Sequence, residues 1–539
     1  MTYTFISLLW LLGTVPFMMF SVTRLTEELH MMQQNTYRND RYLSWWKSKG
    51  KKHYNDLLAL LAVVPLLLIG GTVAEIVGIL LWALIYIVFL RSRDKTPAKK
   101  PLVFTERAIR LYVAMLVIYF IPAIALLFLA VANVGASHFV RGICQLILVL
   151  LPFISPIFML GANTFMQPFE EHKKSEFFQE AQEILEEQTD LIKIGITGSF
   201  GKTSMKHALN RMLEEKYYTL MPPGSYNTPM GITRVVREQL KPIHQVFVAE
   251  MGAKQPGDIE ELCELVVPKY GMITALGECH LESFGSFENI INTKFELMDA
   301  LPEDGIAVLN FDDPAIRANA HRVKCPVISY GVNGEDLDFW AEDIRYLDRG
   351  MEFTLRSKDG AAEELRTRLL GVHNVLNIVG AAAMARQLGV SYKQIRRAVS
   401  ALVPVEHRLE LKTTANGLHI IDDAFNSNPV GAAAAMEVLS KIEGGKKFLI
   451  TPGMVELGEK EYEENKKFGA EAAAACDYIA LVGEKQTQPI KEGILEAGFP
   501  EDHLFVAANL NDANTYVYGK TEKGDYILYE NDLPDTYNE

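Results

Sequence analysis

Long apolar runs fill the first third of the chain. Residues 3–22, 111–133 and 140–161 are each apolar over about 20 positions, the length that an α-helix needs to cross a bilayer. Residues 57–90 form a longer apolar stretch that a glycine pair at 70–71 interrupts. One helix over that stretch would be about 50 Å long, too long for a single crossing, so we expect a hairpin of two helices. The pattern therefore predicts about five membrane spans.

Short apolar runs replace the long ones after residue 165. Residues 166–189 are rich in Glu, Lys and Gln and place apolar residues at helical spacing, which predicts an amphipathic linker helix. Beyond it, strand-like runs alternate with helical patterns, and this order is typical of a parallel, doubly wound sheet. In the last part of the chain we expect strands at 418–421, 447–450, 478–482 and 526–528, and Ala-rich helices at 432–439 and 470–475.

The charges divide the chain in the same place. The 539 residues carry a net charge of −14, but residues 1–165 contain 15 Lys and Arg against 7 Asp and Glu, and the remaining residues contain 38 against 60. The acidic second part argues against non-specific nucleic-acid binding. Five scattered cysteines without a C-x-x-C pair exclude a disulfide framework and argue against a zinc ribbon.

The basic residues of the first part predict a membrane topology. Segments 24–52 and 91–110 each hold seven Lys and Arg, so the positive-inside rule places both in the cytoplasm. The N-terminus and segment 133–140 then lie outside, and everything after residue 165 lies inside. Arg141 is the one basic residue on the outer side. Glu75 lies near the tip of the expected hairpin, where we expect it to be solvated.

A phosphate-binding signature follows the first strand of the second part. Residues 191–196 are strand-like, the segment T-G-S-F-G-K-T-S occupies 197–204, and a helical pattern continues to Leu213. The backbone N–H groups of such a turn face phosphates, Lys202 reaches the β- and γ-phosphates, and the Thr203 hydroxyl ligates Mg²⁺. The strict G-x-x-x-x-G-K-[ST] spacing would need glycine where Ile196 stands.

Three later residues fit the same chemistry. Glu250 ends a second apolar strand at 246–249, and an acidic residue in that position holds Mg²⁺ or its water in many phosphate-loop enzymes. His280 lies in the segment C-H-L-E-S-F-G-S, and Lys294 follows fourteen residues later. Taken alone, a single histidine or lysine carries little functional information.

The ordered set of motifs resembles the Mur ligase family over residues 190–530. It comprises T-G-S-F-G-K-T-S, N-T-P-M-G at 227–231, E-M-G at 250–252, H-L-E-S-F-G-S at 280–286, Lys294, N-F-D-D-P at 310–314, G-V-H-N-V-L-N at 371–377, H-R-L-E at 407–410, D-D-A-F-N-S-N-P at 422–429 and G-M-V-E-L-G at 453–458. The glycine-poor start of the loop is also the family's form. Within the family, the resemblance is greatest to the branch that adds D-alanyl-D-alanine to a muramoyl tripeptide.

The resemblance implies an ATP-dependent ligase that forms an amide through an acyl phosphate. It implies ATP and Mg²⁺, with a second Mg²⁺ at His280 and Lys294, and Lys294 aligns with the lysine that is carbamylated in the family. Its implied catalytic residues are Lys202, His280 and Lys294, and its implied metal-binding residues are Thr203, Glu250, His280 and Lys294. Its implied nucleotide-binding residues are Thr197, Gly198, Ser199, Gly201, Lys202, Thr203, Ser204, Asn310, Arg408 and Asp423. Its implied substrate-binding residues are Asn227, Thr228, Asn426 and Asn428.

The fold expected is an α-helical membrane domain followed by two α/β domains. Residues 1–165 form the membrane domain and 166–189 the linker. Residues 190–402 form a phosphate-loop ATPase-like central domain, and 403–539 form a Rossmann-like, doubly wound C-terminal domain with a hinge near 403–408. The family's soluble members begin with a domain that binds the UDP part of the substrate, and the membrane domain occupies its place here.

Three functions remain open from the sequence. The first is a ligase of peptidoglycan precursor synthesis in the bacterial cell membrane, with its catalytic domains in the cytoplasm. Its partners would be a UDP- or lipid-linked peptide precursor, an amino acid or dipeptide, membrane lipid and membrane proteins of wall synthesis. The second is a ligase for another envelope polymer, such as poly-γ-glutamate or a capsule peptide. The third is a non-catalytic ATP-binding scaffold, which the intact Lys202, Thr203, Glu250, His280 and Lys294 disfavour.

Overall fold

The chain folds into two units, Met1–Ser175 and Glu176–Glu539. A computed structural model describes residues 2–49, 60–61, 71–92, 101–134, 137–224, 226–279, 281–333, 335–347, 349–424, 427–455 and 457–532. The expected order, a helical part followed by two α/β domains, is confirmed.

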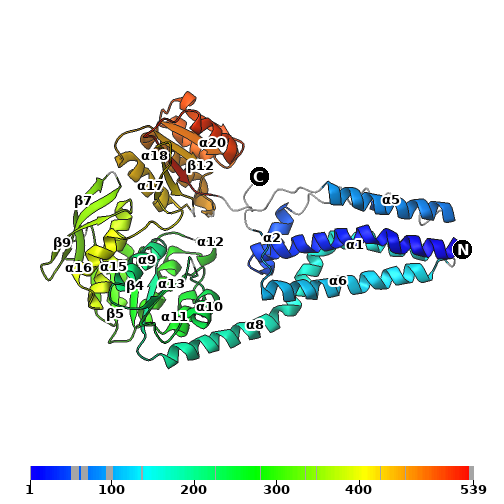
Figure 1. Cartoon of the computed structure of the whole chain (residues 1–539), viewed down its shortest axis with the longest axis horizontal. Helices are drawn as coiled ribbons and strands as arrows, with labels where there is room; N and C mark the ends of the chain where they lie inside the picture. The colour runs from blue at the N-terminus through cyan, green and yellow to red at the C-terminus, as the bar shows by residue number, and fades with distance from the viewer. Residues whose placement is uncertain are drawn as a thin grey trace. The chain divides into compact units, whose positions relative to one another are not determined.

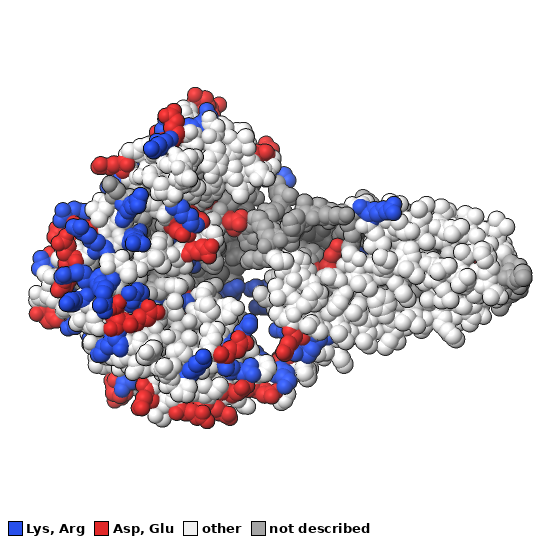
Figure 2. Space-filling model, in the orientation of Figure 1, with Lys and Arg blue, Asp and Glu red and all other residues white. Residues whose placement is uncertain are grey.

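The first unit is a bundle of apolar helices (Figure 1). Its helices are α1 (Thr2–Gln34), α2 (Asn39–Lys49), α5 (Thr72–Arg91), α6 (Glu106–Ala132), α7 (His138–Leu150), the 3₁₀ turn Leu151–Ile154, and α8 (Ser155–Glu187). Within the described residues, four helical stretches are long and apolar enough to cross a membrane: Thr4–Gln34, Thr72–Arg91, Glu106–Ala132 and Phe139–Glu187. Figure 2 shows a face of this bundle that is almost free of Lys, Arg, Asp and Glu, as lipid contact requires.

Side-chain contacts fix the direction of the helices. Trp10 of α1 lies 6.4 Å from Trp82 of α5, and Phe20 lies 5.9 Å from Phe89, so the two helices are parallel. The hydroxyls of Ser21 and Tyr119 lie 2.8 Å apart, and so do those of Thr26 and Tyr112, so α6 runs antiparallel to α1.

A buried ion pair holds three helices together at one end of the bundle. Arg141 of α7 pairs with Glu75 of α5 at 2.6 Å between Nε and Oε1, and both residues are 2% exposed. The indole N–H of Trp10 donates to the same carboxylate at 3.1 Å. The expectation that Glu75 is solvated was therefore wrong, because Arg141 and Trp10 provide the partners that water would otherwise supply.

A second polar cluster lies towards the other end of α1. The Glu28 carboxylate accepts hydrogen bonds from Arg24 at 3.0 Å, from Ser155 at 2.9 Å and from Tyr42 at 2.5 Å, and all four residues are buried. These bonds join α1 to α2 and to the start of α8.

One expected boundary in this unit differs from the structure. Segment 24–52 was treated as a loop, but α1 continues to Gln34 and α2 follows, because residues such as Leu25, Leu29 and Met32 stay in the buried core. The second half of the expected hairpin is α5. The first half lies outside the described residues apart from 60–61.

The second half of α8 belongs to the second unit. Ala181 and Leu185 are buried in its core, and the Arg237 guanidinium lies 3.9 Å above the Phe177 ring and pairs with Glu180 at 2.6 Å. The apolar spacing that predicted an amphipathic helix therefore describes the face that packs on the α/β unit.

A mixed nine-stranded sheet, counted over the described residues, forms the centre of the first α/β domain. Its order is β2-β3-β1-β4-β5-β6-β7-β8-β9, and β7, β8 and β9 are antiparallel. The strands are β1 (Ile192–Thr197), β2 (Thr219–Leu220), β3 (Val246–Glu250), β4 (Tyr270–Ile273), β5 (Ile306–Asn310), β6 (Val327–Gly331), β7 (Phe339–Leu347), β8 (Gly350–Ser357) and β9 (Ala362–Thr367). The antiparallel extension β7–β9 was not predicted.

Helices cover both faces of this sheet (Figure 1). Alternate residues of β3 face opposite cores: Val246 and Val248 pack with α9 and α15, whereas Phe247 and Ala249 pack with α10, α11 and α13. The helices are α9 (Lys202–Leu213), α10 (Pro229–Gln239), α11 (Asp258–Val266), α12 (Leu281–Phe284), α13 (Phe287–Asp299), α14 (Pro314–Asn319), α15 (Val372–Gln387) and α16 (Tyr392–Ser400).

The last domain is a six-stranded sheet over the described residues, in the order β10-β11-β15-β12-β13-β14. All neighbours except β10 and β11 are parallel, which confirms the predicted doubly wound sheet. The strands are β10 (Glu410–Thr413), β11 (His419–Asp423), β12 (Lys447–Thr451), β13 (Tyr478–Val482), β14 (Leu504–Ala507) and β15 (Tyr526–Glu530). The helices are α17 (Pro429–Lys441), α18 (Glu461–Ala475), α19 (Gln488–Glu496) and α20 (Leu510–Tyr518).

The buried pair in the bundle gives a first prediction. Arg141→Met should leave the Glu75 carboxylate buried without its cation and destabilise the protein by about 3 kcal/mol or more. Thermal unfolding of the full chain in detergent, followed by intrinsic fluorescence, measures this loss. The double variant Glu75→Gln/Arg141→Met should recover most of it, and Arg38→Ala, which breaks an exposed ion pair with Asp40, should change little. Equal stability of Arg141→Met and wild type would contradict a structural role for the pair.

Candidate active site

The phosphate loop lies between β1 and α9, as the motif predicted. Gly201 adopts a φ of 79°, and a Cβ there would lie 2.9 Å from the Asn377 side-chain oxygen. Only glycine combines this left-handed backbone with so close an approach. Asn377 comes from α15, so the loop is held from the C-terminal part of the same domain as well as from its own strand.

Hydrogen bonds to the end of β4 fix the first half of the loop. The Ser199 N–H donates to the Ala275 carbonyl at 2.7 Å, and the Ser199 hydroxyl donates to the Gly277 carbonyl at 3.0 Å. The Thr274 hydroxyl donates to the Phe200 carbonyl at 2.5 Å. The loop therefore has a defined shape before any nucleotide is bound.

Lys202 folds back over the loop that it follows. Its ammonium donates to the carbonyls of Gly198 at 2.6 Å and Ser199 at 3.1 Å. An ammonium has three donors, so one remains for a phosphate oxygen. Burial lowers the pKa of Lys202, and the nearby Glu250 carboxylate opposes this shift.

Glu250 ends β3 and binds three side chains, two from α9 and one from the segment before α10. Its Oε1 accepts from the Thr203 hydroxyl at 3.2 Å and from the Asn227 amide at 3.0 Å, and its Oε2 lies 3.2 Å from the Lys206 ammonium. Glu250 is 1% exposed. The structure thus brings two of the four predicted metal ligands, Thr203 and Glu250, together with the predicted substrate residue Asn227. Lys206 is a partner that the motif did not single out.

Lys294 lies on α13 with its side chain buried. It is 3% exposed, and its nearest ring is that of Phe284, 5.9 Å from the ammonium. Burial first and the Lys202 charge second lower the pKa of Lys294 to about 7. The Cys279 thiol is close enough to both lysines to feel their charge, although burial still raises its pKa to about 11. His280 lies outside the described residues.

Several predicted site residues already have partners inside the fold. The Thr197 hydroxyl donates to the Met251 carbonyl at 2.9 Å. The Asn310 amide donates to the Thr274 carbonyl at 2.7 Å and thus joins the ends of β4 and β5. Thr228 caps α10 through the Gly231 N–H, and Ser204 lies half-buried in the first turn of α9. A nucleotide or substrate contact at these positions stays a prediction.

The junction between the two α/β domains presents Arg408. His407 and Leu409 on either side of it have φ values of 60° and 45°. The His407 ring bonds the Asp422 carboxylate at 2.9 Å, and the Leu409 N–H donates to the Asp423 carboxylate at 3.1 Å. The guanidinium of Arg408 interacts with the charges of both Glu250 and Asp423, and burial lowers its pKa.

The predicted substrate residues of the last domain follow β11. The Asn428 side chain accepts from the Gly431 N–H at 3.0 Å and caps α17, so it has at least a structural role. Asn426 lies outside the described residues.

A pair of carboxyl groups that the motifs did not predict lies where the strands β11 and β15 end. Glu530 of β15 is in register with Asp423 of β11, is 1% exposed and accepts a 2.5 Å hydrogen bond from Ser427. Burial raises the pKa of Asp423 to about 6, although a hydrogen bond with Glu530 opposes this rise. Burial and the Asp423 charge together raise the pKa of Glu530 well above its usual range. Only the position of Glu530 at a parallel strand end could have indicated it from the sequence.

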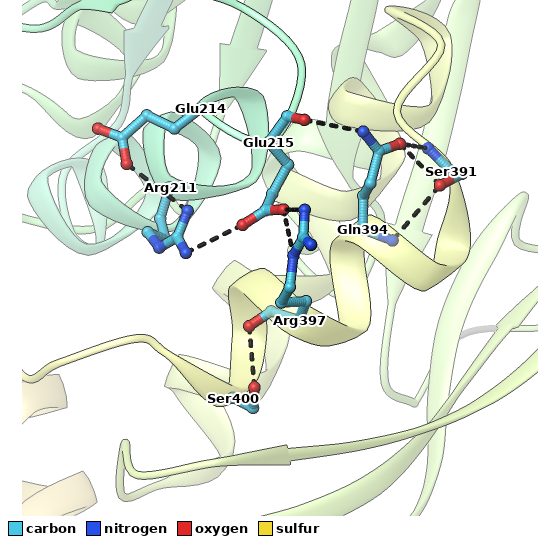
Figure 3. Close-up of polar contacts among 7 residues, drawn as sticks. All are labelled: Arg211, Glu214, Glu215, Ser391, Gln394, Arg397 and Ser400. Atoms are coloured by element: carbon cyan, nitrogen blue, oxygen red, sulfur yellow. Dashed lines mark hydrogen bonds and ion pairs between the residues drawn. The ribbon is translucent and has the colours of Figure 1, made fainter.

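The far end of α9 is attached to α16 (Figure 3). The Glu215 carboxylate pairs with Arg211 at 2.9 Å and with Arg397 of α16, and its carbonyl accepts from Gln394 at 2.8 Å. Because α16 precedes the domain junction, the helix that carries the phosphate loop and the segment that leads to Arg408 share one support.

The protein oxygen atoms available as ligands at this site suit a metal ion that is bound largely by phosphates. Among the described residues no three His, Cys, Asp or Glu side chains converge as a metal site. One carboxylate and one hydroxyl, Glu250 and Thr203, lie side by side next to the phosphate loop. Mg²⁺ takes one or two protein oxygens together with nucleotide phosphates and water, so these residues fit Mg²⁺ delivered with a nucleotide.

Comparison with known sequences identifies the family. The Mur ligase middle domain matches residues 196–385, and the Mur ligase glutamate ligase domain matches residues 407–529. The UDP-N-acetylmuramoyl-tripeptide–D-alanyl-D-alanine ligase of Bacillus subtilis is 32% identical over 339 residues, which are 62% of this chain and 72% of the relative. This chain belongs to the Mur ligase family. The corresponding ligases of Mycobacterium tuberculosis and Escherichia coli are 35% and 31% identical, over 57% and 65% of their own lengths.

Solved structures of Mur ligases agree with this assignment. The MurF ligase of Thermotoga maritima in complex with ADP superposes with a TM-score of 0.61 at 26% identity, covering 68% of this chain and 81% of that one. A MurF structure from Acinetobacter baumannii gives the same TM-score and identity over 78% of its length. The chain is therefore an ATP-dependent, amide-bond-forming ligase of the Mur type.

The carboxyl pair gives a prediction on pH dependence. The folded-state pKa of Asp423, about 6, lies above its ordinary value of 3.8. A raised carboxyl pKa stabilises the fold at low pH, and this contribution is lost as the pH rises through about 6. Glu530→Gln removes the carboxyl whose pKa burial and the Asp423 charge raise well above its usual range, so the variant lacks the loss of stability that this carboxyl causes as the pH rises. The Tm of this variant relative to wild type should therefore rise by about 2 °C or more between pH 5 and pH 8.

Glu522→Gln is the matched control for this measurement, because the Glu522 side chain is 81% exposed in the same domain. Its Tm relative to wild type should not change with pH. A pH-independent difference for Glu530→Gln would show that the two carboxyls do not share a proton in the folded protein.

Proposed function

We propose that this chain joins D-alanyl-D-alanine to the peptide carboxylate of a cell-wall precursor at the expense of ATP. The names of the relatives support the substrates, since the Bacillus, Mycobacterium and Escherichia proteins are all D-alanyl-D-alanine ligases that act on a UDP-N-acetylmuramoyl tripeptide. The observation that carries the proposal is the Glu250 cluster. It places a predicted substrate residue, Asn227, on the same carboxylate as a phosphate-loop residue, Thr203.

The proposed reaction has two steps. A carboxylate oxygen of the precursor attacks the γ-phosphorus of ATP, and ADP leaves. The amine of the dipeptide then attacks the acyl carbon, phosphate leaves with the electron pair of the C–O bond, and the amine loses a proton to solvent. Both steps bring anions together, so fixed cations have to stabilise the transferring group. The free donor of Lys202 is directed to the phosphates, and Arg408 adds a second cation from the domain junction.

Thr203 and Glu250 are the residues that would hold Mg²⁺. When bound, the ion neutralises charge on the β- and γ-phosphates. Lys294 can supply a further ligand only after carbamylation, since an ammonium repels a cation and a carbamate attracts it. Burial and the Lys202 charge lower its pKa to about 7 and so keep part of its amine neutral near pH 7, which supports this modification.

We further propose that the first unit spans the membrane several times with the N-terminus outside and the ligase in the cytoplasm. The parallel packing of α1 and α5 supports it, because two parallel spans require the chain between them to recross the bilayer. The basic segments 24–52 and 91–110 then lie in the cytoplasm, where ATP is available. Glu75 and Arg141 lie near the outer ends of their helices, so their mutual pairing explains a basic residue on that side.

Phosphate release by the full-length protein in lipid nanodiscs tests the reaction. D-alanyl-D-alanine together with UDP-N-acetylmuramoyl tripeptide should stimulate release at least tenfold, and Lys202→Ala should abolish the stimulation because no donor remains for the γ-phosphate. Lys216→Met, a lysine on the same segment far from the loop, should retain it. Stimulation only by a lipid-linked tripeptide would assign a membrane-bound acceptor. Activity with glutamate or a capsule peptide alone would assign another envelope polymer, and no stimulation by any amine would favour the scaffold.

Carbamylation of Lys294 is testable without turnover. At pH 7.5 about half or more of a lysine with a pKa of about 7 is neutral, and the neutral amine adds to CO₂ with loss of one proton. In ¹³C-bicarbonate the wild-type protein should therefore show a carbamate resonance by ¹³C NMR, and the Lys294→Arg variant should lack it. A resonance that persists in Lys294→Arg would place the modification on another residue, and its absence from wild type would refute it.

A further inference from the structure

Lys206 is a completely buried lysine in the second turn of α9. It is 0% exposed, and it lies one helical turn beyond Thr203 on the helix that carries the phosphate loop. Burying an ammonium is costly unless it is fully paired. The groups that pair with the Lys206 ammonium therefore indicate the role of this residue.

Three oxygen atoms surround the Lys206 ammonium. The carbonyl of Gly224 lies at 2.6 Å, the carbonyl of Pro222 at 2.9 Å and the Glu250 carboxylate at 3.2 Å. These match the three donors of an ammonium, so none remains for a phosphate. Lys202, by contrast, makes two bonds to loop carbonyls and keeps one donor. Lys206 is thus not a second phosphate-binding lysine.

The two carbonyls belong to the segment that leads into α10. We call the described residues 222–224 and 226–228 the acceptor loop, because they include the predicted substrate residues Asn227 and Thr228. The acceptor loop reaches Glu250 by two routes: Asn227 donates to it directly at 3.0 Å, and Lys206 bridges it to the carbonyls of Pro222 and Gly224. Gly252 adds a third attachment by donating to the Asn227 carbonyl at 2.8 Å.

We propose that Lys206 is a positioning residue that couples Glu250 to the acceptor loop, so that binding of a metal–nucleotide complex at Glu250 orders this loop. A carboxylate that turns towards a cation has to share its charge between that cation and Lys206. The position of Lys206 then changes, and the two carbonyls bonded to it follow. Only the name of the loop rests on the proposed function, since the contacts themselves do not depend on the identity of the substrate.

Hydrogen exchange of the acceptor loop tests the coupling in the full-length protein in nanodiscs. In the wild type, a non-hydrolysable ATP analogue with Mg²⁺ should slow amide exchange at 224–228 at least threefold. Lys206→Met keeps the length of the side chain but removes all three contacts. Its loop should exchange at least fivefold faster without ligand and should gain no protection with the analogue, whereas the Kd for the analogue should change less than threefold.

Lys216→Met is the matched control. Lys216 also donates to two main-chain carbonyls, those of Leu388 at 3.0 Å and Gly389 at 3.1 Å, but it contacts neither Glu250 nor the acceptor loop. Its loop exchange should equal that of the wild type with and without the analogue. In turnover assays Lys206→Met should raise the KM of the acceptor at least tenfold and that of ATP less than threefold, a split that general destabilisation would not produce.

Wild-type exchange and protection of the loop in Lys206→Met would overturn the proposal. If Lys206→Met does not fold, Lys206→Gln serves instead, because it retains a donor for one carbonyl and loses the charge. Protection by the analogue in Lys206→Gln equal to wild type would equally overturn it. The exchange experiment uses no peptide substrate, so it can succeed even if D-alanyl-D-alanine is not the amine.

Discussion

The paired, buried carboxylate of Glu250 is the interaction on which the active site depends. A carboxylate that is 1% exposed is stable only when cations and donors replace its water. Thr203 and Lys206 supply them from α9, and Asn227 supplies one from the segment before α10. The strand, the phosphate-loop helix and the acceptor loop therefore have to fold into register with one another, because losing any one partner leaves a charge unsatisfied. The same carboxylate is where a metal would bind, so structural and catalytic requirements converge on one residue.

The helical first unit, which we propose to span the membrane, follows the same rule, and an unpaired charge is even more costly in that medium. Glu75 and Arg141 come from helices α5 and α7 and neutralise each other, and Trp10 of α1 donates to the same carboxylate. Apolar packing alone allows helices to slide or rotate against one another, whereas a buried ion pair fixes both depth and rotation. The four-residue cluster around Glu28 and the pair at Glu75 thus set the register of the bundle near its two ends, with aromatic contacts between them.

Patterns within short stretches of the sequence predicted the helices and strands that such stretches determine by themselves. The periodicity of apolar residues predicted α5, α6, β1, β3 and the parallel strands of the last domain. The glycine and lysine of the phosphate-loop motif predicted the conformation of that loop. The antiparallel strands β7–β9 were missed, although β7 does alternate buried and exposed positions. The side-chain pairs could not be predicted because they join distant elements: Lys206 is 44 residues from Glu250, and Glu530 is 107 from Asp423. The periodicity of apolar residues carries no information about such side-chain pairs, and a single sequence offers no other signal for them.

The domain junction shows how the two α/β domains share one site. A left-handed backbone at a non-glycine residue costs on the order of 1 kcal/mol or more, and His407 and Leu409 both adopt it next to Arg408. The strain persists because Asp422 holds the His407 ring and Asp423 holds the Leu409 N–H. Releasing either bond would let the backbone relax and would move the guanidinium away from the charges of Glu250 and Asp423 that it now meets. Asp423 in turn lies in register with the buried Glu530 of the neighbouring strand β15. The position of the Arg408 cation therefore depends on the two carboxylates of the last domain that hold its neighbours, Asp422 and Asp423.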